Sequence, residues 1–218
     1  MKNNFSPRYV AAIGMFTALA FVSVVAARWI PNVQGFLSYE PKDALIVMAG
    51  CIYGPMTCVL ITVLTSFIEM VTISTTGLYG FLMNVVASLA FTVPAACFYY
   101  KNRTKKNAVI GLTLGVISMA AIMILWNYVI TPFYMGVPRE QVAGMLIPVF
   151  LPFNLVKGGI NAGLTLLLYK PIVTALRKAG FAEKKEESKG RFQIGFVLFS
   201  LAVLVSFLLW FLVMIGVL

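Results

Sequence analysis

Residues 39–55, YEPKDALIVMAGCIYGP, contain an apolar run that stops at Gly54 and Pro55. A helix over residues 43–54 would be roughly 18 Å long, whereas the hydrocarbon core of a bilayer is about 30 Å thick. Such a short segment enters a membrane only where protein or a water-lined cavity satisfies its backbone, and short segments often border a substrate site. We therefore predict a short helix beside a cavity, separated from the next helix at Gly54 and Pro55.

The rest of the chain consists largely of long apolar blocks. Of the 218 residues, 61% are hydrophobic and 11% are charged, against roughly 45–50% apolar residues in an ordinary soluble domain. Six blocks are comparable with the ~20 residues that a spanning helix needs. They are residues 10–30, 56–73, 78–100, 108–135, 144–178 and 192–218. The sequence therefore predicts an all-α polytopic membrane protein.

The same blocks divide the chain into three parts. Residues 1–180 are predicted to form a six-helix membrane domain that includes the short helix. Residues 181–191 form a charged cytoplasmic linker, and residues 192–218 an additional transmembrane helix. The first block is longer than the ~7–15 apolar residues of a cleavable signal, so we expect it to remain as the first helix.

Positively charged residues indicate the orientation. Lys and Arg number 17 against 7 Asp and Glu, for a net charge of +10, and most of these cations lie in residues 2–8, 101–106 and 170–191. The positive-inside rule places such segments in the cytoplasm. With a cytoplasmic N-terminus, the break after the short helix puts all three segments on the cytoplasmic side. A single helix over residues 43–73 would instead put the second segment outside.

The residues that are missing exclude most enzyme chemistry. The chain has no His, the side chain that most often serves as a general base or metal ligand. It contains neither the G-x-x-x-x-G-K-[ST] loop that binds ATP nor the G-x-S-x-G turn of serine hydrolases. Cys51, Cys58 and Cys97 lie in apolar blocks without a C-x-x-C pair, so we expect buried thiols. We predict no enzyme and no metal site.

A lysine inside the block at 144–178 is the strongest single indication of a binding site. A Lys near the bilayer centre costs about 2.5–3.5 kcal/mol on insertion scales and by default marks a site with a specific partner. Lys157 shares a helical face with Asn154 and Asn161, because the three are spaced i, i+3 and i+7. The alternative is that these side chains only join helices through hydrogen bonds.

Two further carboxamides and two loop residues are expected near Lys157. Asn84 and Asn127 fall a few residues from the outer ends of their blocks, at a depth similar to that of the lysine. Tyr39 and Glu40 lie on the first outer loop and can cover a cavity there. Carboxamides donate and accept hydrogen bonds whereas an ammonium only donates, so the site suits a neutral, polar, aromatic small molecule.

Two other features allow two interpretations each. Glu69 is the one carboxylate well inside a long block; it would suit a coupling proton site, but its place near the outer end favours a wetted residue at the rim. Gly14 and Ala18 form a small-xxx-small step, which lets helices approach closely, either within the chain or against another membrane protein.

Four stretches of the chain resemble a known transporter family. They are YEPKDALIVMAGCIYGP at 39–55, GLYGFLMNVVAS at 77–88, LWNYVITPFY at 125–134 and LPFNLVKGGINAGLTLLLYKP at 151–171. Over roughly residues 8–180 the chain is similar to the riboflavin-specific substrate-binding (S) components of energy-coupling-factor (ECF) transporters. Residues 192–218 depart from the six-helix pattern of that family.

The resemblance implies a fold of six helices that captures riboflavin from the outer face of the bacterial cell membrane and delivers it inward. Riboflavin is then the transported ligand, and no cofactor is implied. The implied partners are the transmembrane coupling subunit EcfT and two cytoplasmic ATPase subunits. Small residues on the first helix, here Gly14 and Ala18, would meet the coupling subunit.

The resemblance also implies which residues contact the vitamin. Members of the family hold the flavin with an Asn on helix 5 and with an Asn and a Lys on helix 6, which match Asn127, Asn154 and Lys157. Their first outer loop, here residues 36–40, covers the vitamin. The residues themselves leave three alternatives open: an S component for another vitamin or a flavin nucleotide, a stand-alone secondary transporter coupled to protons through Glu69, and a membrane scaffold.

Overall fold

The computed structural model describes residues 6–182 and 194–218, which form a bundle of helices. In chain order the helices are α1 (Pro7–Ala27), α2 (Lys42–Tyr53), α3 (Pro55–Thr72), α4 (Gly77–Lys101), α5 (Lys105–Val129), α6 (Thr131–Met135), α7 (Arg139–Met145), the π-helical turn η1 (Leu146–Phe150), α8 (Leu151–Lys178) and α9 (Ile194–Met214). Residues 28–41, between α1 and α2, are called the outer loop below. Most of the predicted linker at 181–191 lies outside the described residues.

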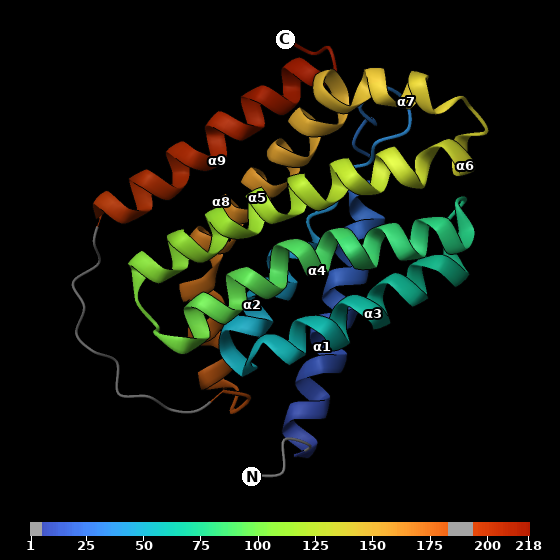
Figure 1. Ribbon diagram of the computed structural model, residues 1–218. Helices are drawn as coiled ribbons and strands as arrows, with labels where there is room; N and C mark the ends of the chain where they lie inside the picture. The colour runs from blue at the N-terminus through green and yellow to red at the C-terminus, as the bar shows by residue number, and fades with distance from the viewer. Residues whose placement is uncertain (1–5, 183–193) are drawn as a thin grey trace.

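Six helical segments are long and apolar enough to cross a membrane: α1, α3, α4, α5, α9 and the continuous segment at 139–178. The short α2 adds one segment to these six. Helix α1 begins at the end of the molecule opposite to the end where α9 terminates, and the outer loop, α6 and α7 lie at the latter end (Figure 1). The predicted all-α polytopic fold, with its short second helix and its additional helix at the C-terminal end, is confirmed.

The break between α2 and α3 falls at Gly54, where the sequence predicted it. Its φ of +110° is a conformation that L side chains rarely adopt, and Pro55 begins α3 at a position where a missing N–H costs no helical hydrogen bond. Gly50 of α2 lies so close to α3 that a Cβ there would be 2.1 Å from the sulfur of Cys58. Most of the 12 residues of α2 are buried, so protein surrounds a helix too short to cross alone.

The segment between α5 and α8 is more broken than the two plain helices predicted at 108–135 and 144–178. Gly136, with φ +65°, ends the separate five-residue helix α6. The π-helical turn η1 precedes α8 because Pro152 has no N–H to donate to the carbonyl of Pro148 and its ring crowds that carbonyl. The helix predicted at 108–135 is therefore interrupted at Ile130, whereas the helix predicted at 144–178 is continuous but contains a π-helical turn.

The expectation of three buried thiols was right for two of them. Cys51 and Cys58 are buried, whereas Cys97 is exposed on the outside of the bundle. An apolar block alone does not distinguish the face of a helix that packs inward from the face that meets lipid, which explains the error. All three cysteines are free.

Candidate substrate-binding site

A row of alternating charges lies buried between four parts of the chain. Lys157 of α8 places its Nζ 2.8 Å from Oε2 of Glu40 in the outer loop. The same Glu40 oxygen is 3.2 Å from Nζ of Lys42, at the start of α2, and that ammonium is 2.7 Å from Oε2 of Glu69 in α3. Lys42 is fully buried. We call this row, Lys157–Glu40–Lys42–Glu69, the ion-pair chain.

Hydrogen bonds extend the ion-pair chain to α4. The carboxamide of Asn84 donates to Oε1 of Glu69 at 2.9 Å. One turn further along α4, the Ser88 hydroxyl donates to Asp43 at 2.5 Å. Because a buried charge is tolerated only when paired and hydrogen-bonded, these contacts explain how so many ionisable groups stay inside an apolar bundle.

Asn161 fixes the outer loop and the start of α2 to α8. Its carboxamide nitrogen donates to the backbone carbonyl of Glu40 at 3.1 Å, and its oxygen accepts from the backbone N–H of Ala44 at 3.2 Å. That N–H belongs to the first turn of α2, where donors have no partner within the helix. Asn161 is therefore a structural residue that positions Glu40 beside Lys157.

The two ammonium groups keep Glu40 ionised. Burial by itself would raise the pKa of this carboxyl, but the charges of Lys157 and Lys42 outweigh that effect and hold the pKa below its usual value. Together with Asp43 and Glu69, the cluster contains three carboxyl groups and two amines. If all are ionised, its net charge is −1.

The two predicted carboxamides Asn127 and Asn154 are buried but hydrogen-bonded within their own segments. Asn127 donates to the carbonyl of Met123 at 2.6 Å and accepts from Thr131 at 2.8 Å. Asn154 donates to the carbonyl of Phe150, in the π-helical turn, at 2.7 Å. Within the described residues, neither carboxamide is hydrogen-bonded to the ion-pair chain.

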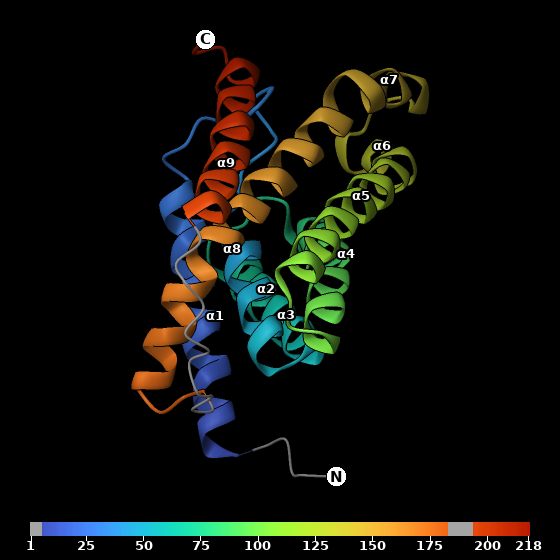
Figure 2. The ribbon, with the colours of Figure 1, turned by 90° about the vertical axis from the view of Figure 1, so that its left-hand side faces the viewer.

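Tyr39 lies next to Glu40 but contacts a different part of the bundle. Its ring packs against that of Phe211 of α9, with centroids 5.7 Å apart. Its hydroxyl is buried without a hydrogen-bond partner among the described residues. Figure 2 shows the outer loop beside the C-terminal half of α9. Tyr39 therefore joins the loop to a helix that the sequence had left without a role.

The structure corrects one interpretation and adds residues that the sequence analysis missed. Glu69 is buried and ion-paired with Lys42, so its interpretation as a wetted rim residue was wrong. The sequence analysis gave no role to Lys42, which directly precedes the predicted short helix, or to Asp43, the first residue of that helix. A physical signal was available, because a helix too short to cross must begin at a depth where its first residues are already buried.

Gly14 and Ala18 of α1 face outward. A Cβ built on Gly14 would meet nothing within 4 Å, and Ala11 and Ala18, on the same face, are also exposed. Packing of this face within the chain, one of the two interpretations above, is not observed among the described residues. The face is open to another helix.

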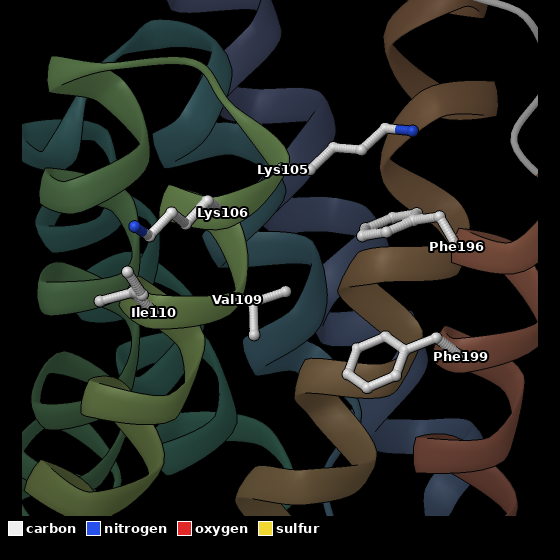
Figure 3. A pocket seen from close by; sticks show the side chains of 6 residues that line it. All are labelled: Lys105, Lys106, Val109, Ile110, Phe196 and Phe199. Atoms are coloured by element: carbon white, nitrogen blue, oxygen red, sulfur yellow. The ribbon is translucent and has the colours of Figure 1, made fainter.

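A groove at the opposite end of the molecule from the outer loop lies apart from all the predicted site residues. It has a volume of about 380 Å³ between the starts of α5 and α9 and is lined by Lys105, Lys106, Val109, Ile110, Phe196 and Phe199. Figure 3 shows the two lysine side chains extending to opposite sides, and Nζ of Lys105 lies 4.8 Å from the centre of the Phe196 ring. Its lining is mainly apolar, as expected of a surface that meets lipid.

The fold and the buried ionic site together define a multi-pass membrane protein of the transport class. Residues 8–169 match the family model described as the ECF transporter, substrate-specific component, and the chain belongs to this family. Membership in a transporter family confirms the expectation that the chain is not an enzyme. Helix α9 lies beyond the matched residues.

Similar proteins include two riboflavin transporters called RibU. That of Staphylococcus aureus (strain TCH60) is 23% identical over 172 residues, which cover 76% of this chain and 90% of that protein. That of Streptococcus thermophilus (strain ATCC BAA-250 / LMG 18311) is 25% identical over 181 residues, which cover 78% and 85%. A solved S component of a bacterial ECF transporter has a TM-score of 0.66 and 24% identity, covering 77% of this chain and 96% of that chain. The structural likeness shows a shared fold.

Proposed function

We propose that this chain captures riboflavin at the outer face of the bacterial cell membrane, as the substrate-specific subunit of an ATP-driven ECF transporter. The observation that carries the proposal is the buried Lys157, which lies with Asn154 on α8 beside the outer loop and within the family match. The two RibU relatives, each aligned over most of its length, support riboflavin as the substrate.

The chemistry of the candidate residues suits a flavin. The ring system of riboflavin presents carbonyl oxygens, ring nitrogens and one N–H, and its ribityl chain carries hydroxyls. The ammonium of Lys157 supplies donors only, whereas a carboxamide has two N–H donors and an acceptor oxygen. The hydrogen bonds of Asn127 and Asn154 to their own helices use one N–H each, so each carboxamide retains a donor for a ligand.

The proposed orientation places the N-terminus in the cytoplasm and the outer loop outside. Basic residues support it, since they occur at the start of α1, in the turn between α4 and α5 and at the end of α8, which lie at the same end of the molecule (Figure 1). The coupling subunit EcfT and two ATPases are then the proposed partners. The open face around Gly14 and Ala18 is the proposed contact with the coupling subunit.

The proposal is tested by titrating the purified chain with riboflavin in mild detergent while the fluorescence of the flavin is recorded. Saturable quenching with one-to-one stoichiometry is expected. A folded preparation whose absorbance spectrum shows no bound flavin, and which quenches none of the added riboflavin, would reject the proposal. In that case Asn127, Asn154 and Lys157 would either join helices through hydrogen bonds or bind a different substrate.

Flavin mononucleotide is expected to bind at least ~10-fold more weakly than riboflavin. A phosphate monoester carries about −1.5 to −2 charges at neutral pH, and both ammonium groups of the buried cluster beside the proposed site are already paired with carboxyl groups. Burying an anion without a cationic partner costs free energy. Parallel fluorescence titrations with the two flavins measure the ratio, and equal affinities would contradict the expectation.

Gly14→Leu is expected to reduce riboflavin uptake at least ~10-fold while leaving riboflavin binding unchanged. The added side chain projects from a face that nothing in the chain covers, so it obstructs a close helix contact with a partner. Uptake of labelled riboflavin is measured in cells that supply the coupling subunit and the ATPases. Gly195→Leu is the matched control, because Gly195 is also open but lies on α9. Normal uptake by the Gly14 variant would show that this face is not the docking surface for the coupling subunit.

A further inference from the structure

Helix α9, which lies beyond the family match, packs on α8 at backbone contact distance. A Cβ on Gly163 would be 3.0 Å from Cα of Leu204 and 3.2 Å from its backbone nitrogen. A Cβ on Gly159, one turn earlier, would be 2.4 Å from the ring of Phe207. Glycines four residues apart let two membrane helices approach closely. The position of α9 is therefore fixed by α8.

The contact between α8 and α9 continues into the outer loop. One apolar cluster joins residues from all three elements, and we call it the outer cluster. It contains Ile30, Val33, Leu37 and Tyr39 of the loop, Phe153, Val156, Ile160 and Leu164 of α8, and Leu204, Phe207, Phe211 and Met214 of α9, with Ile215 just beyond the helix. Val33 and Phe211 are 1% and 5% exposed. The loop is thus held on α9 by buried apolar surface.

Two consecutive residues attach the end of the loop to different partners. Glu40 is bonded to Lys157 and Asn161 of α8, whereas Tyr39 packs on Phe211 of α9. Opening the loop away from α8 must break both the ion pair and the aromatic contact. The ion pair belongs to the proposed site, and the aromatic contact depends on a helix outside the family match.

We propose that α9 is a clamp on the outer loop, and that Phe211 is a positioning residue that sets how fast the loop opens. The inference rests on the proposed function in one respect, because it takes riboflavin to be the ligand that enters and leaves past the loop. A clamp raises the barrier to opening, so it slows entry and release of the ligand together. Damage to the binding residues has a different kinetic signature, because it speeds release without speeding entry.

Phe211→Ala is expected to raise both the association and the dissociation rate constants of riboflavin by about 10-fold, with a smaller change in Kd. The reason is that the variant loses a buried ring and its contact with Tyr39. Stopped-flow quenching gives the association rate constant, and release into excess competitor gives the dissociation rate constant. Phe199→Ala is the matched control, since Phe199 is an exposed phenylalanine on the same helix. Phe211→Leu keeps apolar volume and is expected to fall between wild type and Phe211→Ala, and it replaces Phe211→Ala if that variant does not fold.

A second measurement needs no ligand. Val33 is buried in the outer cluster, so a thiol introduced by Val33→Cys in a Cys97→Ser background reacts with a water-soluble maleimide only when the loop opens. Phe211→Ala is expected to raise this labelling rate several-fold, and Phe199→Ala is expected to leave it unchanged.

The two measurements separate the clamp from the proposed function. Faster labelling in a protein that does not quench riboflavin would support the clamp and reject riboflavin as the substrate. Riboflavin binding with unchanged labelling and unchanged rate constants in the Phe211 variants would overturn the clamp and leave the proposed function standing. A rise in the dissociation rate constant alone, without faster labelling, would also overturn it, because that result indicates damage to the site.

Discussion

Lys42→Met is expected to lower the free energy of unfolding by about 3–5 kcal/mol, the usual cost of removing one partner from a buried ion pair. Lys42 is fully buried and lies between the carboxylates of Glu40 and Glu69. Its loss removes the cation between these two carboxylates and leaves Glu69 without an ion-pair partner among the described residues. In a chain of this size, such a change corresponds to a fall of roughly 6–20 °C in Tm, which thermal unfolding in detergent measures.

Two further variants test whether the loss of the ion pairs causes the fall in Tm. Lys178→Met removes an exposed lysine at the end of α8 and is expected to leave Tm almost unchanged. Adding Glu69→Gln to Lys42→Met removes the uncompensated carboxylate and is expected to restore part of the lost stability. If the double variant melts no higher than Lys42→Met, the stabilising contribution of Lys42 is not its pairing with Glu69.

Lys157→Met is expected to weaken riboflavin binding by about 1–3 kcal/mol, which is roughly 5- to 150-fold in Kd. The variant keeps an unbranched side chain of similar length but removes the one buried ammonium on the face that carries Asn154. Folding should be less affected than by Lys42→Met, because Glu40 keeps its contact with Lys42. Quenching of flavin fluorescence measures the change in Kd.

The control for this binding experiment is again Lys178→Met, on the same helix. It is expected to bind riboflavin as wild type does. Equal Kd values for the Lys157 and Lys178 variants, in preparations that are folded by circular dichroism, would exclude Lys157 from the binding site.

The sequence was sufficient for the fold because its decisive features are local. The Gly54–Pro55 break depends on the φ freedom of one residue and the ring of the next, and the lengths of the apolar blocks depend only on the thickness of the bilayer. The broken segment after α5 was harder to predict. The π-helical turn depends on two prolines four residues apart within an otherwise helical pattern.

The candidate site could be predicted only in part, because its geometry depends on contacts between distant segments. A helical face predicted that Asn154, Lys157 and Asn161 lie together, and all three are buried. The pattern did not indicate that Lys157 pairs with Glu40, or that Lys42 lies at the centre of the ion-pair chain. From the sequence alone, a charged residue at the edge of an apolar block that is exposed to water cannot be distinguished from one that is paired with a buried partner.

The role of α9 could not be predicted from the sequence, because its hydrophobicity is nearly uniform around the helix. Only the positions of Gly159 and Gly163 on α8 and of Tyr39 in the loop distinguish its packed face. These residues belong to other parts of the chain, and their relation to α9 exists only in three dimensions.

The pairing of Lys157 with Glu40 has a consequence for biosynthesis. The two residues are 117 positions apart, and a ribosome that adds about 5–20 residues per second needs on the order of ten seconds to travel that far. During this interval α2, with its charged first turn, has already been made, whereas the lysine of α8 has not. Lys42 and Glu69, which are 27 positions apart, can neutralise each other early. Glu40 of the outer loop then gains its second cationic partner, Lys157, only when α8 enters the bilayer.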